Sequence, residues 1–235
     1  RTDLPEKPSV QAHLTNVTNT MRATTLEKGS AKVFTVEHLL SALYGMEIDN
    51  CFVEMDSVEP PVADGSSLTF VKLIEEAGVH ELDVPRRPLV IQKQHLIQDG
   101  DKFIALVPHD GFRITFTSIN PHPMLGVQFF DSMITKSSYI NEVSFARTIA
   151  FTEELEMLKK LGLGKGGTIE NVVVYDKTSC LSVPRSDDEL VRHKVLDIIG
   201  DLSLLNRPIQ GHVIAVKSSH TLNNQLTHQI FEELQ

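Results

Sequence analysis

The sequence predicts an α+β fold, in which helices and strands are mixed without a regular βαβ alternation. Helical periodicity is clearest where apolar side chains fall at i, i+3, i+4 and i+7, at Val36, Leu39, Leu40 and Leu43. Strand character is clearest in residues 102–107 and 112–117, which a turn at Asp110-Gly111 separates. The 235 residues correspond to about one or two domains and suffice to bury a core without disulfides.

The first half of the chain combines polar, strand-like segments with two helices. Residues 8–26 are predicted to be extended, because Val10, Ala12 and Leu14 alternate with polar residues as in a β-strand. A turn is expected at Lys28-Gly29. The other expected elements are a helix from an N-cap at Thr35 to Gly45, a strand at 51–55, a loop marked by Pro60-Pro61 and Asp64-Gly65, and a helix at 70–77 ended by Gly78.

The second half follows a proline- and arginine-containing linker at residues 83–88. We expect strands at 89–93, 102–107, 112–117, 172–175 and 211–216. The expected helices are one around 139–143, one at 152–161, one capped by Asp187 or Asp188 and running through Leu205, and one at 222–234.

Composition narrows the classes of function. Hydrophobic residues make up 41% and charged residues 23% of the chain, as in globular proteins. The net charge of −9 argues against general binding to nucleic acids or anionic membranes, and no apolar run approaches the roughly 20 residues of a membrane span. Cys51 and Cys180 stand far apart, which argues against a disulfide framework and fits a reducing compartment.

One polar row lies on the otherwise apolar helix at 188–202. His193, Asp197 and Asp201 follow one another at i+4 spacing and therefore share a helix face. Buried carboxylates and imidazoles are costly unless they are paired or bind a metal, and His with Asp is a common ligand set of catalytic zinc. An ion pair on a surface helix explains the same spacing equally well. This helix alone therefore does not decide between a metal site and a surface ion pair.

Two further candidates lie far from that helix. Glu37-His38 would let a metal-bound His38 leave Glu37 free as a general base, the division of labour seen in HExxH metallohydrolases. Its ordinary interpretation is a helix first turn with an acid that the dipole favours. His220 stands at a strand–helix junction, where active-site residues often occur, although a single histidine there is more often structural.

Taken together, six motifs make the chain closely resemble the UDP-3-O-acyl-N-acetylglucosamine deacetylase family of lipid A biosynthesis. They are, in chain order, TVEHLLSAL at 35–43, IDN at 48–50, DGS at 64–66, ART at 146–148, VRHKVLDIIGDL at 191–202 and SHTLNN at 219–224. The resemblance covers nearly the whole chain, and the first and fifth blocks are very specific.

The resemblance implies a zinc-dependent hydrolase of the cytoplasm of Gram-negative-type bacteria. Its substrate is UDP-3-O-acyl-N-acetylglucosamine, from which it releases the 2-acetamido group as acetate in the committed step of lipid A biosynthesis. The implied fold has two similar domains, each a layered sandwich of helices and sheet, with the active site between them. On this chain the domains correspond to residues 1–84 and 89–235, with a βαβ insert near 152–176.

The resemblance also assigns roles to individual residues. His38, His193 and Asp197 are the implied zinc ligands, and Glu37 is the general base. His220 stabilises the oxyanion and is the implied general acid, Thr148 donates to the oxyanion, and Asp201 orients His220. The implied substrate contacts are Lys194 for the phosphate-bearing portion, Gly166, Gly167 and Thr168 in the insert that shapes the acyl passage, and Ile149 after the ART block.

Two departures from the family pattern stand out. The strand with a Gly-Val-Gly-Leu-His segment that normally precedes the equivalent of Arg1 is absent, so we expect either a truncated chain or an incomplete first domain. Ile149 replaces an aromatic residue, so contacts to the acyl chain or glucosamine are expected to differ there. Two alternatives stay open: a zinc amidohydrolase of the same fold acting on another amide or ester, and a non-catalytic binding protein with a retained site. Oligomeric state is not inferred.

Overall fold

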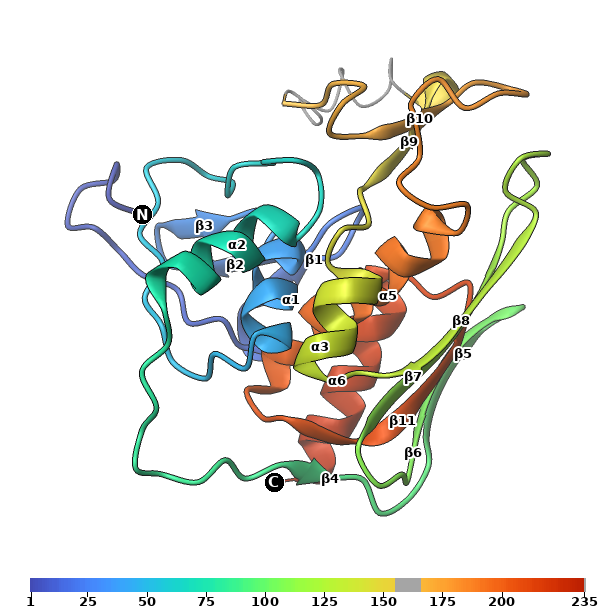
Figure 1. Ribbon diagram of the computed structural model, residues 1–235. Coiled ribbons are helices and arrows are strands. Elements are labelled where there is room, and N and C mark those ends of the chain that lie inside the picture. The colour runs from blue at the N-terminus through green and yellow to red at the C-terminus, as the bar shows by residue number, and fades with distance from the viewer. Residues whose placement is uncertain (155–165, 235) are drawn as a thin grey trace.

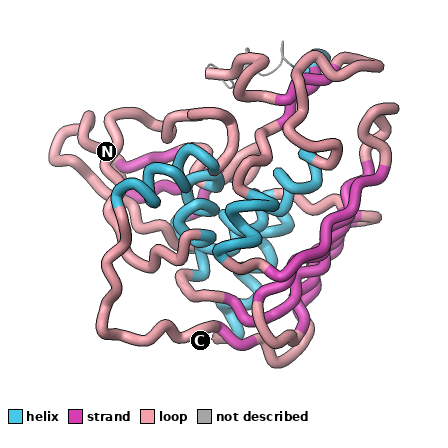
Figure 2. Tube along the Cα trace, viewed as in Figure 1, coloured by secondary structure: helices cyan, strands magenta, loops and turns pink. Residues whose placement is uncertain are grey.

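The computed structural model describes residues 1–154 and 166–234 and confirms the α+β fold. A small and a large β-sheet enclose a layer of helices between them (Figures 1 and 2). The division into two domains at residues 84–89 remains a prediction. Within the described ranges, no helix has both the length and the apolar character that crossing a membrane requires.

The small sheet is an antiparallel meander formed by the N-terminal part of the chain. Its strands are β1 (Val17–Asn19), β2 (Thr25–Lys28) and β3 (Ala31–Val33), in that order, with a 3-10 turn η1 (Leu14–Asn16) before them. This partly confirms the strand material expected over residues 8–26. The helices α1 (Glu37–Gly45) and α2 (Leu68–Ala77) follow.

The large sheet lies on the opposite side of the helices. Its strands are β4 (Leu89–Val90), β5 (His95–Asp99), β6 (Lys102–Val107), β7 (Phe112–Ile119), β8 (Val127–Met133) and β11 (Ile209–Val216). The order is β5-β6-β11-β7-β8, with β11 parallel to β7 and antiparallel to β6, while β4 pairs with β11. The last strand of the chain, β11, therefore lies in the middle of the sheet. The chain then continues into α6, which packs in the helical layer.

The middle layer is built around α5 (Glu189–Leu202), which a 3-10 turn η3 (Ser203–Leu205) extends. Its apolar stripe of Val191, Val195, Ile198, Ile199 and Leu202 is almost completely buried, as the sequence pattern predicts. The other elements here are α3 (Lys136–Ser138), the π-helical turn η2 (Tyr139–Val143) and α6 (His220–Glu233).

A two-stranded parallel ribbon projects beyond these layers. It pairs β9 (Ile149–Phe151) with β10 (Val173–Tyr175), and both strands lie at the top of the view in Figure 1. The expected strand at 172–175 is thus confirmed. The helix expected at 152–161 falls largely outside the described residues, as does the central part of the βαβ insert, residues 155–165.

Several predicted elements differ from the structure. Residues 51–55 form no strand: residues 51–54 are exposed, Phe52 completely, because burial and pairing override β propensity. Thr35 is not the N-cap of α1. Its backbone is left-handed, with φ of 52°, and its hydroxyl donates to Glu59, so Val36 takes the cap position. Strand β4 is shorter than the expected 89–93, and β5 and β8 were not expected.

Candidate active site

Close contact between α1 and α5 brings the first turn of α1 against the C-terminal half of α5. Gly200 makes this contact possible, because a Cβ built on it would lie 2.2 Å from the carbonyl oxygen of Glu37. Since α1 starts at Glu37, the TVEH block meets the face of α5 that carries the i+4 polar row. Two segments more than 150 residues apart thus form one site.

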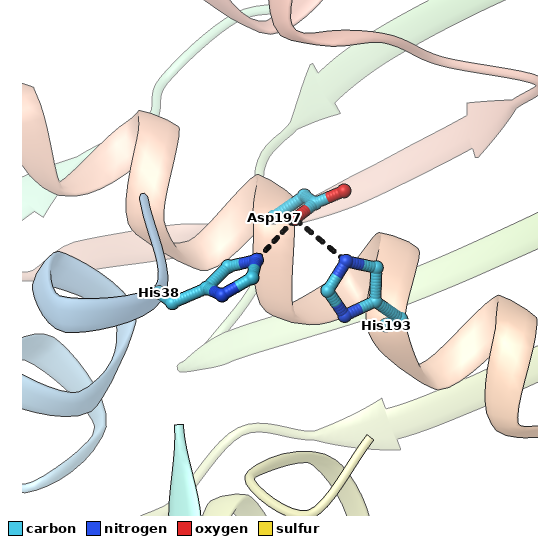
Figure 3. Close-up of side chains that lie close together, drawn as sticks. All are labelled: His38, His193 and Asp197. Atoms are coloured by element: carbon cyan, nitrogen blue, oxygen red, sulfur yellow. Dashed lines mark ion pairs between the residues drawn. The ribbon is translucent and has the colours of Figure 1, made fainter. Parts of the chain in front are cut away.

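His38, His193 and Asp197 form a compact cluster of side chains that could hold a metal ion at this contact (Figure 3). Asp197 Oδ1 lies 3.4 Å from His193 Nε2 and 3.9 Å from His38 Nε2. One ligand atom from each residue falls within 4.8 Å of the other two. The imidazole rings of the two histidines stand nearly perpendicular, with centroids 5.0 Å apart.

Hydrogen bonds to neighbouring residues orient the side chains of this cluster. His193 Nδ1 lies 3.1 Å from the carbonyl oxygen of Ala146, so it donates there and leaves the Nε2 lone pair toward Asp197. Lys194 donates to Asp197 Oδ2 at 2.8 Å. The other oxygen, Asp197 Oδ1, is buried without a hydrogen-bond partner among the described residues. A buried carboxylate oxygen without a partner is costly, so this donor set fits a divalent cation.

Charge states in the cluster suit a metal as well. Burial lowers the pKa of His38 to about 3 and also lowers the pKa of His193, so both rings are neutral. Burial opposes ionisation of Asp197, but the facing cations of Lys194 and His220 outweigh it and hold its pKa well below the usual range. Two neutral imidazoles and one carboxylate are the protonation states that metal binding requires.

Glu37 lies beside the cluster without belonging to it. Its side chain is buried, and Oε2 accepts a hydrogen bond of 3.0 Å from the backbone N–H of Thr24. Burial raises the pKa of Glu37 to about 7, an increase that the carboxylates of Asp201 and Asp197 reinforce and His220 opposes. A carboxylate with a pKa near neutrality exchanges protons readily at physiological pH.

Asp201 and His220 form a second buried unit next to Asp197. His220 is the first residue of α6, and its Nδ1 lies 2.8 Å from Asp201 Oδ2. Asp201 also accepts from Thr24 Oγ1 at 2.6 Å and from Asn223 Nδ2 at 2.8 Å. Burial alone would lower the pKa of His220, but the two aspartates outweigh it and raise the pKa to about 10. The imidazole is therefore a cation at neutral pH.

A cavity of about 510 Å³ gives access to these groups. The residues predicted for the site that line it are Glu37, His38, Thr148, Ile149, Gly166, Gly167, His193, Lys194, Asp197 and His220. Asp201 lies behind His220, and Thr168 is exposed at the surface outside the cavity lining.

Other groups at the site carried no clear signal in the sequence. Arg22, Phe70 and Leu190 also line the cavity, and Thr24 bonds to both Glu37 and Asp201. No motif or spacing marks these residues in the sequence, and only the folding of the chain brings them to the site. Asn223 is different, because it belongs to the SHTLNN block that the sequence analysis singled out.

Comparison with known families identifies the chain's relatives. Residues 1–232 match the LpxC family model, described as UDP-3-O-acyl N-acetylglycosamine deacetylase. The chain belongs to the UDP-3-O-acyl-N-acetylglucosamine deacetylase family. The resemblance that the six motifs indicated is thereby confirmed.

Individual members of this deacetylase family align over nearly the whole chain. A UDP-3-O-acyl-N-acetylglucosamine deacetylase of Myxococcus xanthus is 44% identical over 235 residues, which cover 99% of this chain and 75% of the relative. Its counterpart in Pseudomonas entomophila is 42% identical over 99% of this chain and 78% of the relative. That of Anaeromyxobacter dehalogenans is 42% identical over 95% and 73%, respectively. The family-model match over residues 1–232 includes every residue of the site described above.

Proposed function

We propose that this chain is a zinc-dependent deacetylase that hydrolyses the 2-acetamido group of UDP-3-O-acyl-N-acetylglucosamine and releases acetate, the committed step of lipid A biosynthesis. The observation that carries the proposal is the buried cluster of His38, His193 and Asp197 at the wall of a cavity, with Glu37 beside it. Membership of the deacetylase family supports the substrate.

In this proposal His38 and His193 hold zinc through Nε2, and Asp197 holds it through Oδ1, the buried oxygen without a partner among the described residues. When bound, zinc supplies a Lewis acid that acidifies a water molecule and polarises the amide carbonyl. Three protein ligands with an accessible face are typical of catalytic rather than structural zinc sites. The ammonium of Lys194 on the other oxygen of Asp197 balances its charge.

Glu37 is the proposed general base. With a pKa of about 7, a large fraction of the carboxylate is ionised at neutral pH and can take a proton from the attacking water. The N–H of Thr24 fixes one carboxylate oxygen, so the other remains available for the proton. Once protonated, Glu37 can return that proton to the leaving amine.

His220 and Thr148 are the proposed stabilisers of the oxyanion. His220 is held as a buried cation by Asp201, and Thr148 contributes to the same cavity. Donors fixed in advance around a developing negative charge lower the barrier because no reorganisation is needed during the reaction. His220 is also a second source of the proton that the leaving amine requires.

The remaining assignments concern the substrate and the setting. We assign Lys194 to the phosphate-bearing portion, and Ile149, Gly166 and Gly167 to the acyl chain, all four of which line the cavity. The exposure of Thr168 outside that lining weakens its assignment. We further infer a cytoplasmic enzyme with two domains, 1–84 and 89–235, that contribute to the site from α1 on one side and α5 and α6 on the other.

Release of acetate from UDP-3-O-acyl-N-acetylglucosamine tests the proposal. We expect turnover by the zinc-loaded protein, loss of turnover after chelation and recovery on adding zinc. UDP-N-acetylglucosamine without the acyl chain serves as the matched substrate and should react much more slowly. Turnover of another amide or ester but not of this substrate would indicate a different hydrolase of the same fold. Zinc-loaded protein that turns over none of them would indicate a binding protein.

A further inference from the structure

The polar row on α5 is one turn longer than the sequence analysis recognised. Glu189 precedes His193 by four residues, so Glu189, His193, Asp197 and Asp201 follow one another at i+4 spacing. Glu189 is 1% exposed and has no place in the proposed chemistry. A buried carboxylate in line with two metal-ligating residues calls for an explanation, because burying a charge is costly.

The main partner of Glu189 is Arg147, the middle residue of the ART block, and the backbone N–H of Arg185 also donates to Glu189 Oε2 at 2.6 Å. Glu189 Oε1 accepts from the backbone N–H of Arg147 at 3.0 Å and from its Nε at 2.9 Å, and Oε2 accepts from Nη2 at 3.2 Å. The same guanidinium donates to the carbonyl oxygens of Glu170 and Val183. Both side chains are almost completely buried, 6% and 1% exposed.

Arg147 stands between two residues of the site. The carbonyl of Ala146 accepts from His193 Nδ1, and Thr148 lines the cavity. Because Glu189 binds the backbone N–H as well as the side chain of Arg147, it fixes the main chain that carries both neighbours. On the other side, the N–H of Thr148 donates to the carbonyl of Gly65 at 2.9 Å. The segment 146–148 is thus held from α5 and from the DGS loop.

We propose that the Glu189–Arg147 pair is a positioning device for the active site. It sets the carbonyl of Ala146 that orients the ligand His193, and it sets Thr148 relative to the reacting carbonyl. This proposal rests on the proposed function. The pair mirrors Asp201 at the opposite end of the polar row, which positions His220 through a direct hydrogen bond. Buried ion pairs contribute little net stability compared with apolar replacements, so positioning accounts better for the pair than stabilisation alone.

The test compares two conservative variants with the wild-type protein. Arg147→Lys keeps the charge but loses the planar fork that binds Glu189 with two nitrogens. Glu189→Gln keeps the shape but loses the charge and one acceptor. Arg113→Lys is the matched control, because Arg113 makes a comparable paired contact with Asp131 between β7 and β8. Each folded protein is titrated with zinc against a chromophoric chelator, and kcat and KM are measured separately.

We expect Arg147→Lys and Glu189→Gln to weaken zinc binding by ~10–100-fold, the usual effect of losing a contact behind a ligand. Their kcat should fall while KM changes less than about threefold, because transition-state donors move but substrate contacts stay. Arg113→Lys should match the wild type in both measurements. If either site variant is unfolded without zinc, the zinc concentration needed to fold it should rise by the same factor.

Three results would contradict the account, and they can be distinguished from one another. Wild-type protein that binds zinc, with both variants equal to it in zinc affinity and kcat, would overturn the positioning role and leave the proposed function intact. A lower melting temperature in the variants with unchanged zinc affinity and kcat would also overturn it, since that pattern indicates a purely structural pair. Wild-type protein that binds no zinc would overturn the proposed function itself.

Discussion

His220 lies between two aspartates of α5, one at each ring nitrogen. Its Nδ1 is 2.8 Å from Asp201 Oδ2, and its Nε2 is 3.9 Å from Asp197 Oδ2. The side chains of all three residues are at least nine-tenths buried. The short contact to Asp201 fixes the ring while the other nitrogen stays near the metal-ligating cluster. This arrangement explains why the imidazole is charged despite its burial.

The first prediction concerns pH. If His220 must be protonated, activity should fall with rising pH as it loses its proton, and its pKa of about 10 places this basic limb far above the ordinary histidine value. Asp201→Asn removes a negative charge that favours the protonated ring, so the limb should move to lower pH. The measurement is kcat/KM as a function of pH, with zinc content determined in parallel.

The acidic limb of the same pH profile, where activity falls with decreasing pH, provides the internal reference for that experiment. It should report the ionisation of Glu37, coupled to that of the attacking water, and rate should rise with pH through this range. A basic limb that stays in place in Asp201→Asn, or that persists in His220→Ala, would assign the limb to another group.

Glu37→Gln separates the proposed general base from the proposed metal ligands. Glu37 lies beside the cluster of His38, His193 and Asp197 but is not part of it, so the variant should keep its zinc. Turnover should fall by at least ~10²–10³-fold, the scale of a lost general base. Zinc analysis and steady-state kinetics on the same preparation check both points. Loss of zinc from this variant would mean that Glu37 is itself a ligand.

Thr148→Val tests the proposed contribution of a hydroxyl to the oxyanion. Valine has nearly the same shape but cannot donate, so kcat should fall by about 10²-fold with little change in KM. Thr148→Ser restores the hydroxyl and should recover most of the rate. Equal kcat in the valine and serine variants would show that the hydroxyl takes no part.

Gly200→Ala tests the helix contact that assembles the site. The new Cβ would fall 2.2 Å from the carbonyl oxygen of Glu37, so α1 and α5 must separate. We expect a loss of about 1–3 kcal/mol in the free energy of unfolding, typical of overpacking. Urea denaturation measures it, with Glu76→Ala on the exposed face of α2 as a control that should change stability by less than about 0.5 kcal/mol. Equal effects of the two substitutions would show that the contact tolerates a side chain.

Local periodicity explains which elements were predictable from the sequence. Helix α5 carries a long buried apolar stripe, α1 a shorter one whose Leu39, Leu40 and Leu43 are half-buried, and β6 matches the expected residues 102–107. Strand β8 was missed because it is an edge strand whose Val127 and Phe129 are exposed, so no buried alternation marks it. Residues 51–55 were wrongly predicted to form a strand, because no local sequence signal shows that their apolar side chains face solvent.

The residues of the candidate site were also predictable only where a local sequence pattern marks them. Spacing placed His193, Asp197 and Asp201 on one face, and Glu37-His38 and His220 were separate candidates. The motif resemblance combined them into one site. Glu189 continues the same row by one turn, yet its meaning depends on Arg147, 42 residues earlier in the chain. Long-range pairs of this kind arise from the packing of loops against α5, which local sequence patterns do not encode.

Zinc content and deacetylation measured together on His193→Ala test the central claim most directly. The wild-type protein should carry about one zinc per chain and release acetate from UDP-3-O-acyl-N-acetylglucosamine. His193→Ala should lose both zinc and turnover, because it removes a proposed ligand whose Nε2 lies 3.4 Å from Asp197 Oδ1. His212→Ala, on β11 away from the cluster, should retain both. Zinc-free wild-type protein with full activity, or a His193→Ala variant that keeps its zinc and its turnover, would contradict the account.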